Sequence, residues 1–180
     1  MTTTTRIATS ALLGLMIAGA PGRGDLAPAR APEVAPRVSG PQEAEVIGVV
    51  VDQRTQAPMV LLQGKRDRRQ LAMAIGPAEA TGIAVPLHGV TPPRPLTHDL
   101  FLTLFGRLKV SVTRVVITDL RDDIYYATLH LNGSSGELTL DSRPSDAIAL
   151  AIRAKAPVWI EDRVFDKSGG EGTPSRRPHI

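Results

Sequence analysis

Residues 141–153 constrain the fold more than any other part of the chain, because they join a helix start to side chains suited to close packing. Pro144 fits the first position of a helix, where its missing N–H would have no partner. Asp146 follows in the first turn, where a carboxylate can cap free amides and meets the positive end of the helix dipole. Small and aliphatic side chains then recur at helical spacing, at Ala147, Ile148, Ala151 and Ile152. The pattern predicts a helix that lies close against a sheet.

β-rich runs and further helical segments fill the region from residue 43 to residue 167. Strands are predicted at residues 43–52, 59–63, 70–75, 110–119, 124–131, 137–140 and 157–160. Helices are predicted from Pro77 to about His88 and from His98 to about Leu108, with a last helical turn at residues 161–165. This order predicts an α+β class: a single compact domain with a mixed, mostly antiparallel β-sheet and three main helices.

Several single residues refine these expectations. Pro86 is expected to distort the last turn of the first helix, and Thr97 to cap the second. Leucines at four-residue spacing share one face of that second helix, namely Leu100, Leu104 and Leu108. The dipeptide Asn132-Gly133 predicts the turn that leads into the strand at residues 137–140.

Four segments are expected along the chain. Residues 1–20 are predicted to be an export signal, with Arg6 ahead of a short apolar run and Ala18-Gly19-Ala20 as a cleavage site. An organelle transit peptide or a wrongly chosen start codon would also give this Thr-rich, acid-free beginning. Residues 21–42 are a Pro- and Ala-rich linker, residues 43–167 the domain, and residues 168–180 a flexible tail. The apolar run is too short for a stable membrane span, so we expect a periplasmic or secreted protein.

The basic balance of the chain does not indicate a phosphate-binding face. The net charge of +3 comes from the segments outside the domain, because residues 43–167 hold 15 Lys or Arg and 15 Asp or Glu. Only six aromatic residues are present, which leaves no evident stacking platform for nucleic acid. No cysteine occurs, so disulfides and thiolate metal sites are excluded.

An acid stands in the first turn of each main helix: Glu79, Asp99 and Asp146. Helix capping and dipole interactions explain each of them taken alone, at about 0.3–1 kcal/mol apiece. The alternative starts from the attraction of helix N-termini for phosphate. Acids at these positions would repel a phosphate unless a divalent cation lay between the carboxylate and the phosphate oxygens. If the three helix starts converge, the set therefore predicts a metal-assisted phosphodiesterase.

Other polar residues offer complementary chemistry. His98 could act as a general acid or base near neutral pH, and Arg94 or Arg143 could hold a phosphate with two hydrogen bonds. In the alternative interpretation, His98 is merely solvated or bonded to a neighbour, and the two arginines pair with Asp99 and Asp146. Three acids at a strand-to-strand turn suit turn chemistry better than metal binding, namely Asp119, Asp122 and Asp123. The charged run at residues 65–69 is predicted to be a solvated hairpin tip, with nucleic-acid contact as the minor interpretation.

Common catalytic motifs are missing. Ser134-Ser135 lacks the spacing of a nucleophile elbow, and Ser145 with His98 gives only a weak case for a hydrolase pair. No dinucleotide-binding, P-loop or His-Glu-x-x-His motif occurs. Dinucleotide-dependent oxidoreductases, P-loop NTPases and the common zinc proteases are therefore excluded.

Five segments in order resemble the bifunctional nuclease family: residues 75–80, 94–100, 115–120, 126–127 and 143–150. The resemblance covers about residues 43–167 and implies a compact α+β domain, often self-associating, that cleaves both RNA and DNA. The family motifs match Glu79, Arg94, His98, Asp99, Asp119, Arg143, Ser145 and Asp146. The chain departs from the family pattern at Ala72, Ala74, Pro86 and Ser142, positions that bear on packing rather than on the polar set.

Two functions are therefore considered. The first is a nuclease with nucleic acid as substrate and Mg²⁺ or Mn²⁺ as cofactor. Its catalytic residues would be His98, Asp99 and Asp146, its substrate-binding residues Arg94, Arg143 and Ser145, and its metal ligands Glu79, Asp99 and Asp146. The second is a non-catalytic oligomeric module in which the same residues fix helix starts and subunit contacts. We expect a homo-oligomer in either case.

Overall fold

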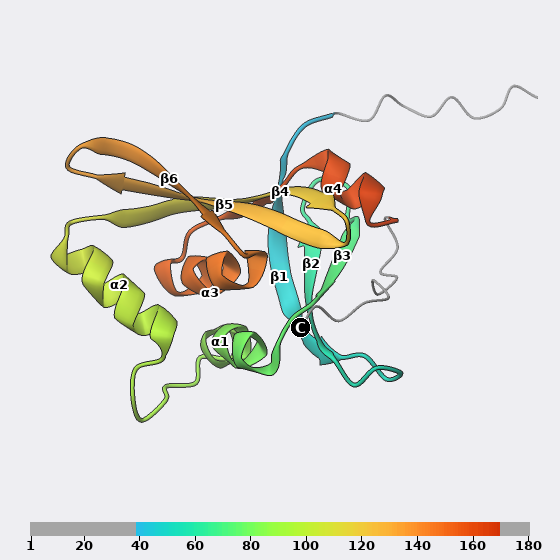
Figure 1. The fold of residues 1–180 in the computed structure, drawn as a ribbon, viewed down its shortest axis with the longest axis horizontal. Helices are drawn as coiled ribbons and strands as arrows, with labels where there is room; N and C mark the ends of the chain where they lie inside the picture. Colours follow the sequence, from blue (N-terminus) through green and yellow to red (C-terminus); the bar gives the residue numbers. More distant parts are fainter. Residues whose placement is uncertain (1–38, 170–180) are drawn as a thin grey trace, which may run out of the picture. The chain divides into compact units, whose positions relative to one another are not determined.

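Seven strands form one mixed sheet in the order β3-β2-β1-β7-β4-β5-β6 (Figure 1). The computed structural model describes residues 39–169. Its strands are β1 (Gln42–Val51), β2 (Pro58–Gly64), β3 (Gln70–Ala74), β4 (Ser111–Arg121), β5 (Ile124–Gly133), β6 (Gly136–Ser142) and β7 (Val158–Ile160). The helices are α1 (Pro77–Leu87), α2 (Thr97–Arg107), α3 (Pro144–Ala154) and α4 (Asp162–Lys167). These elements confirm the predicted α+β class with three main helices.

Three of the segments expected from the sequence lie wholly or mostly outside the described residues. They are the export signal at residues 1–20, most of the linker at residues 21–42, and most of the tail at residues 168–180. Within the described part of the chain, no helix has the length and apolar character needed to cross a bilayer.

The short strand β7 joins two antiparallel halves of the sheet. It runs parallel to β4, with Val158 beside Val115, and antiparallel to β1, with Val158 beside Ala44. All other strand pairs in the described residues are antiparallel. Because a parallel pair needs a crossover, the helix α3 passes over the sheet between β6 and β7.

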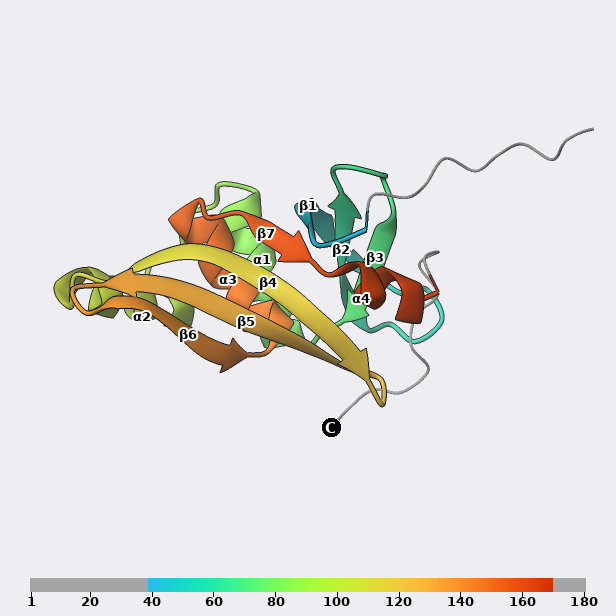
Figure 2. The same cartoon turned by 90° about the horizontal axis from the view of Figure 1, so that it is seen from above.

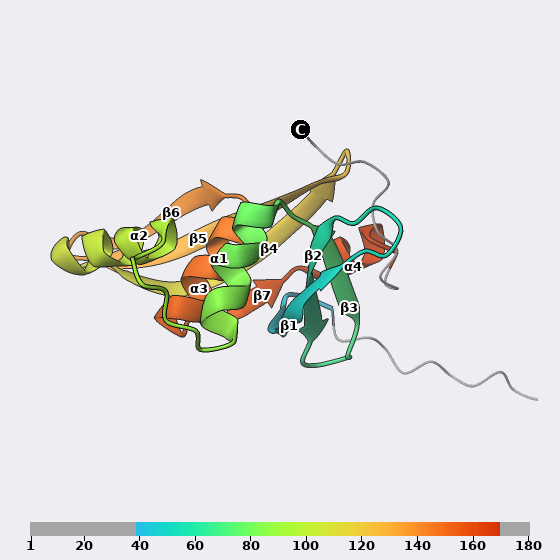
Figure 3. The same cartoon turned by 90° about the horizontal axis from the view of Figure 1, so that it is seen from below.

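Helices α1, α2 and α3 lie on the same face of strands β4, β5 and β6, as the views from above and below agree (Figures 2 and 3). Helix α3 is the central one and packs against α1, α2, β4 and β5. Its buried residues are Pro144, Ser145, Ala147, Ile148, Ala149, Leu150 and Ala151. The buried surface is therefore wider than the narrow predicted stripe, because helices pack along α3 as well as the sheet beneath it.

Helix α2 is packed much less tightly than α3. None of its residues is fully buried, and the predicted leucine face points away from the core: Leu100, Leu104 and Leu108 are each more than half exposed. Leu102 and Phe105 instead pack against the core from the other side of the helix. The spacing correctly places the three leucines together, but on the solvent side.

The predicted turn at Asn132-Gly133 is wrong by two residues. Gly133 pairs with Gly136 at the end of the β5–β6 hairpin, so Ser134 and Ser135 form the turn. Gly136 takes a positive φ of 102°, which a glycine tolerates without strain. At the β4–β5 turn, by contrast, Asp122 and Asp123 both have positive φ, in agreement with the turn interpretation of these two acids. For Asp119 that interpretation is wrong, because Asp119 lies within β4 and pairs with Lys167 at 2.6 Å.

The charged tip between β2 and β3 is not simply solvated. Arg69 lies with its guanidinium carbon 4.5 Å from the centre of the Phe165 ring and forms ion pairs with Asp67, Asp162 and Asp166. The buried side chain of Gln42 donates to both carboxylate oxygens of Asp67 at 3.0 Å. The tip therefore fastens the start of β1 to helix α4.

Candidate active site

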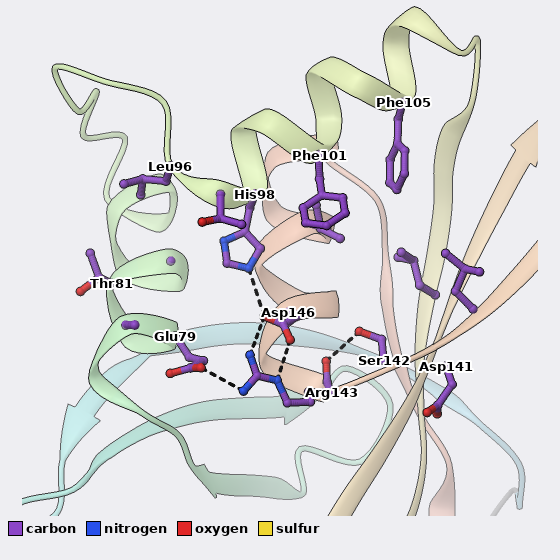
Figure 4. A pocket seen from close by; sticks show the side chains of 16 residues that line it. Glu79, Thr81, Leu96, His98, Phe101, Phe105, Asp141, Ser142, Arg143 and Asp146 are labelled. Carbon is purple, nitrogen blue, oxygen red and sulfur yellow. Dashed lines mark hydrogen bonds and ion pairs between the residues drawn. The ribbon is translucent and has the colours of Figure 1, made fainter.

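A groove of about 910 Å³ opens where α1, α2 and the first turn of α3 meet strands β5 and β6 (Figure 4). One end carries the charged or titratable side chains of Glu79, His98, Arg143 and Asp146. The other end is apolar and is lined by Phe101, Phe105, Leu129, Leu140 and Leu150. The sequence places these two ends together because His98 and Phe101 lie one turn apart on α2.

Arg143 occupies the centre of the charged end. It precedes Pro144 in an extended conformation, which is the conformation that a following proline favours. Its side chain folds back over the helix start: Nε donates to Asp146 Oδ2 at 2.7 Å and Nη2 to Asp146 Oδ1 at 3.1 Å. On its other side, Nη1 lies 3.0 Å from Glu79 Oε1. The guanidinium is thus shared by two carboxylates, although 65% of its side chain remains exposed.

Glu79 and Asp146 are held by side chains rather than by free amides. The hydrogen-bond partners of the Asp146 carboxylate are Arg143 and His98, and Glu79 pairs with Arg143. Glu79 also folds back over the N-cap residue of α1, since a Cβ on Gly76 would overlap its carboxylate. For these two acids the capping interpretation is wrong, although both still lie near positive helix ends.

His98 is packed tightly against α1. A Cβ on Gly82 would lie 2.8 Å from His98 Cε1 and 3.1 Å from Nδ1, so the ring needs a glycine at that point of the helix. The other ring nitrogen, Nε2, lies 3.3 Å from Asp146 Oδ1 and donates to it when it carries the proton. Because Nε2 faces the charged end of the groove, Nε2–H is the group through which His98 could give a proton to a ligand there.

The environment keeps Asp146 ionised at neutral pH. Partial burial raises its pKa, but the hydrogen bonds from Arg143 and His98 outweigh burial and hold the pKa below the ordinary value. An ionised carboxylate beside an imidazole stabilises the ring when it becomes protonated.

Asp99 has a different set of partners. Arg153 Nε donates to Asp99 Oδ1 at 2.7 Å, and the Leu96 backbone N–H donates to Asp99 Oδ2 at 2.8 Å. Burial raises the pKa of Asp99, but these two bonds outweigh burial and lower it. Asp99 thus caps α2 as the capping interpretation predicts, although the N-cap residue is Leu96 rather than Thr97.

Arg153 ties the three helices together. Its side chain is only 7% exposed, and Nη1 donates to the carbonyls of Gly82 at 2.6 Å and Ala149 at 2.9 Å. With the pair to Asp99, it links α1, α2 and α3 at one point. This contact fixes α2, and hence His98, relative to the start of α3.

The three predicted metal ligands, Glu79, Asp99 and Asp146, do not share one set of partners. Among residues 39–169, no three His, Cys, Asp or Glu side chains are arranged so that they could hold a metal ion. Glu79 and Asp146 converge on Arg143, whereas Asp99 is engaged with Arg153. Only the first two acids are placed to act with a ligand in the groove.

Two further predicted residues do not line the groove. Arg94 lies exposed in the connection between α1 and α2. Ser145 is 7% exposed and lies within the buried part of α3. The structure therefore brings together His98, Asp146, Arg143 and Glu79, and leaves Arg94, Ser145 and Asp99 away from the groove lining.

Sequence reasoning missed Gly82, Arg153, Phe101 and Phe105 as site residues. A glycine inside a helical pattern is a recognised sign of close packing, so Gly82 carried a readable signal. Arg153 stands among Ala and Ile on a packed helix, which is also unusual. The two phenylalanines carried no signal beyond the scarcity of aromatics in the chain.

The fold and the groove together define an α+β domain in which an imidazole, two carboxylates and an exposed arginine are in contact at one end of a groove. Residues 60–172 match the family described as bifunctional nuclease domain, and the chain belongs to this family.

Two groups of relatives match the chain, and the rice proteins carry the family's name. An uncharacterized protein of Mycobacterium tuberculosis is 38% identical over 127 residues, which cover 71% of this chain and 76% of the relative. Bifunctional nuclease 1 of Oryza sativa subsp. indica and the bifunctional nuclease of Oryza minuta are each 33% identical over 86 residues. Those 86 residues cover 46% of this chain and 26% of each rice protein.

Proposed function

We propose that this domain is a nuclease that hydrolyses phosphodiester bonds in RNA and DNA. The observation that carries the proposal is the continuous contact from Glu79 through Arg143 and Asp146 to His98 at one end of an open groove. Membership of the bifunctional nuclease domain family and the names of the rice relatives support the same activity.

Each residue of the contact has a role in this proposal. Arg143 binds a non-bridging oxygen of the scissile phosphate, which its exposed position allows without unfolding the helix start. Nε2–H of His98 donates its proton to the leaving oxygen as the bond between phosphorus and that oxygen breaks, and Asp146 accepts a proton from the attacking water. Before the reaction Asp146 stabilises the protonated imidazole, and Glu79 orients Arg143.

We also propose that Mg²⁺ or Mn²⁺ assists the reaction. The groove is lined by three acids, Glu79, Asp141 and Asp146, and by one arginine, so a phosphate meets net negative charge there. Mg²⁺ is commonly held by one or two carboxylates together with substrate phosphates, and Glu79 and Asp146 could supply such carboxylates. The cation would neutralise the phosphate and lower the pKa of a bound water.

The test is cleavage of single-stranded RNA and DNA by the purified chain, with and without EDTA, beside an Asp146→Asn/His98→Ala double variant. We expect cleavage by the wild type only, and its loss in EDTA with recovery on adding Mg²⁺ or Mn²⁺. Cleavage that is the same in the double variant would identify a contaminating nuclease and refute the proposal. Cleavage that survives EDTA would refute metal assistance but not the nuclease activity itself.

The second candidate is a non-catalytic binding module, which one observation favours. Glu79, Arg143, Asp146 and His98 pair with one another, as do the members of a purely structural network. This candidate predicts that the chain binds oligonucleotides or a partner without cleaving any of them under the conditions above.

We propose further that the chain self-associates through the exposed leucine face of α2, formed by Leu100, Leu104 and Leu108. An apolar stripe of this kind costs free energy in water and is relieved when another surface covers it. Sedimentation velocity should show a mass above that of one chain for the wild type, and a single-chain mass for Leu104→Glu. A wild type that sediments as one chain at all accessible concentrations would refute self-association.

The expectation of export remains a proposal as well. It is tested by expressing the full chain with a C-terminal tag, fractionating the cells and determining the N-terminal sequence of the recovered protein. Recovery outside the cytoplasm, cleaved near residue 20, is expected; full-length protein confined to the cytoplasm would contradict it.

A further inference from the structure

We propose that the apolar half of the groove is a binding site for one unpaired nucleobase, and that the site therefore selects single-stranded nucleic acid. The inference rests on the proposed function, since it assumes that the phosphate lies at the Arg143 end. It adds a substrate class and assigns a role to two of the six aromatic residues of the chain.

The two phenylalanines form one wall of the groove. Phe101 and Phe105 are four residues apart on α2 and both project from the helix into the space beside it (Figure 4). Their ring centres are 6.2 Å apart with an angle of 59° between the planes. The remaining apolar lining of this end comes from Leu129, Leu140 and Leu150. Phe101 is 49% exposed, so its side chain can still receive a flat ligand.

The distance between the two ends of the groove matches one nucleotide. His98 and Phe101 are three residues apart on one helix, so their Cβ atoms are separated by about 5–6 Å. A polynucleotide presents a charged phosphate and a flat, largely apolar base within the same repeating unit. A phosphate at Arg143 and His98 therefore brings the attached or adjacent base to the ring of Phe101.

An unpaired base fits this wall, but a paired one does not. In a duplex each base is stacked on both faces and hydrogen-bonded at its edge, so an aromatic side chain cannot cover its face. A single strand leaves the face free, and stacking on an aromatic ring accepts every base. An apolar wall with few hydrogen-bonding groups thus selects strandedness rather than sequence.

Continuity with the charged end favours a nucleic acid over a second copy of this chain as the occupant. The phenylalanines share one groove with His98, Arg143 and Asp146, whereas the leucines of the exposed face do not line it. A subunit covering the groove would bury the charged residues as well.

Binding is best measured in a His98→Ala background, so that cleavage does not consume the probe. The probes are a 12-nucleotide single strand, its duplex, and an abasic strand of equal length that retains the phosphates without the bases. The variants are Phe101→Ala, Phe101→Trp and a matched control, Ile47→Ala, which removes a residue of the same 49% exposure on β1.

We expect Phe101→Ala to weaken binding of the single strand about 10-fold, the scale of one lost stacking contact. Phe101→Trp and Ile47→Ala should bind the single strand as the background does. The abasic strand should bind about 10-fold more weakly than the intact strand to the background protein, and no more weakly to Phe101→Ala. The duplex should be insensitive to all three substitutions.

Several results would overturn the inference. One is equal binding of intact and abasic strands by the background protein, and another is equal loss in Phe101→Ala and Ile47→Ala. A change of sedimenting mass in Phe101→Ala would show that the wall is a subunit contact instead. The proposed function fails separately: a chain that shows the expected base dependence but cleaves nothing refutes the nuclease and leaves the base site standing.

Discussion

The imidazole of His98 lies against the backbone of Gly82, so closely that a methyl group on residue 82 would come within 2.8 Å of the ring. This contact sets the depth to which the histidine enters the groove. It also explains a glycine in the middle of α1, where alanine would otherwise favour the helix by about 1 kcal/mol.

Gly82→Ala should therefore push the His98 ring away from Asp146 and lower the rate of phosphodiester cleavage at least 10-fold. Because no residue of α2 is fully buried, the helix can shift and the fold should survive. The matched control is Gly106→Ala, since a Cβ there meets nothing within 4 Å. It should leave activity unchanged and raise stability by about 1 kcal/mol. Wild-type activity in Gly82→Ala would show that the His98 contact is not needed.

Arg143→Gln should change the pH dependence of the reaction. The Arg143 hydrogen bonds help to hold the pKa of Asp146 below its ordinary value, so their loss raises that pKa. Asp146 would then become protonated at a higher pH, and the acid limb of the pH–rate profile should move to higher pH. KM should also rise, because the phosphate loses its ligand. Arg121→Gln, an arginine paired with Asp119 outside the groove, serves as control; equal profiles for both variants would contradict the assignment.

Asp99→Asn should lower the free energy of unfolding by about 2 kcal/mol at neutral pH, because a hydrogen-bonded pair with a nearly buried arginine is lost. The pKa of Asp99 is lowered in the folded state, so its contribution is present above the unfolded value of about 3.9 and disappears as pH falls through the folded value. Urea unfolding should show the full difference from wild type near pH 7 and a shrinking difference in increasingly acid solution. A difference that is constant with pH would contradict this account.

Asp162→Ala should destabilise the domain without affecting its chemistry. Asp162 accepts from the Gly40 N–H at 2.6 Å and pairs with Arg66 at 2.9 Å and with Arg69. Its loss should cost about 2–3 kcal/mol, whereas Asp166→Ala, which removes an exposed partner of Arg69, should cost less than about 1 kcal/mol. Rates of cleavage by both folded variants should equal that of the wild type. Reduced cleavage by folded Asp162→Ala would place the charged tip in the active machinery.

The order and type of the secondary-structure elements could be predicted from the sequence, because β-rich runs and proline-started helices are local signals. The turn at Ser134-Ser135 could not, since Asn132-Gly133 has the stronger turn propensity but is drawn into the ladder with β6. The exposure of the α2 leucines to solvent could not be predicted from the sequence either. A periodic apolar face shows that residues lie together and does not show which side the core takes.

The site was predictable only in part for a related reason. Asp99 and Asp146 look alike in sequence, as acids in the first turn of a helix. What separates them is Arg153, which is 54 residues from Asp99 and meets it only after α2 and α3 pack. Arg94 and Ser145 likewise match family motifs, but the fold directs one to an exposed connection and buries the other.

The central claim, that the charged end of the groove cleaves nucleic acid, is tested most directly by the initial rate of single-stranded RNA cleavage by His98→Ala. Its matched control is His88→Ala, which removes an exposed histidine after the end of α1. Loss of a general acid or base should lower the rate by about 10²–10⁴-fold in His98→Ala, while His88→Ala cleaves as the wild type does. Equal rates in all three proteins would contradict the claim.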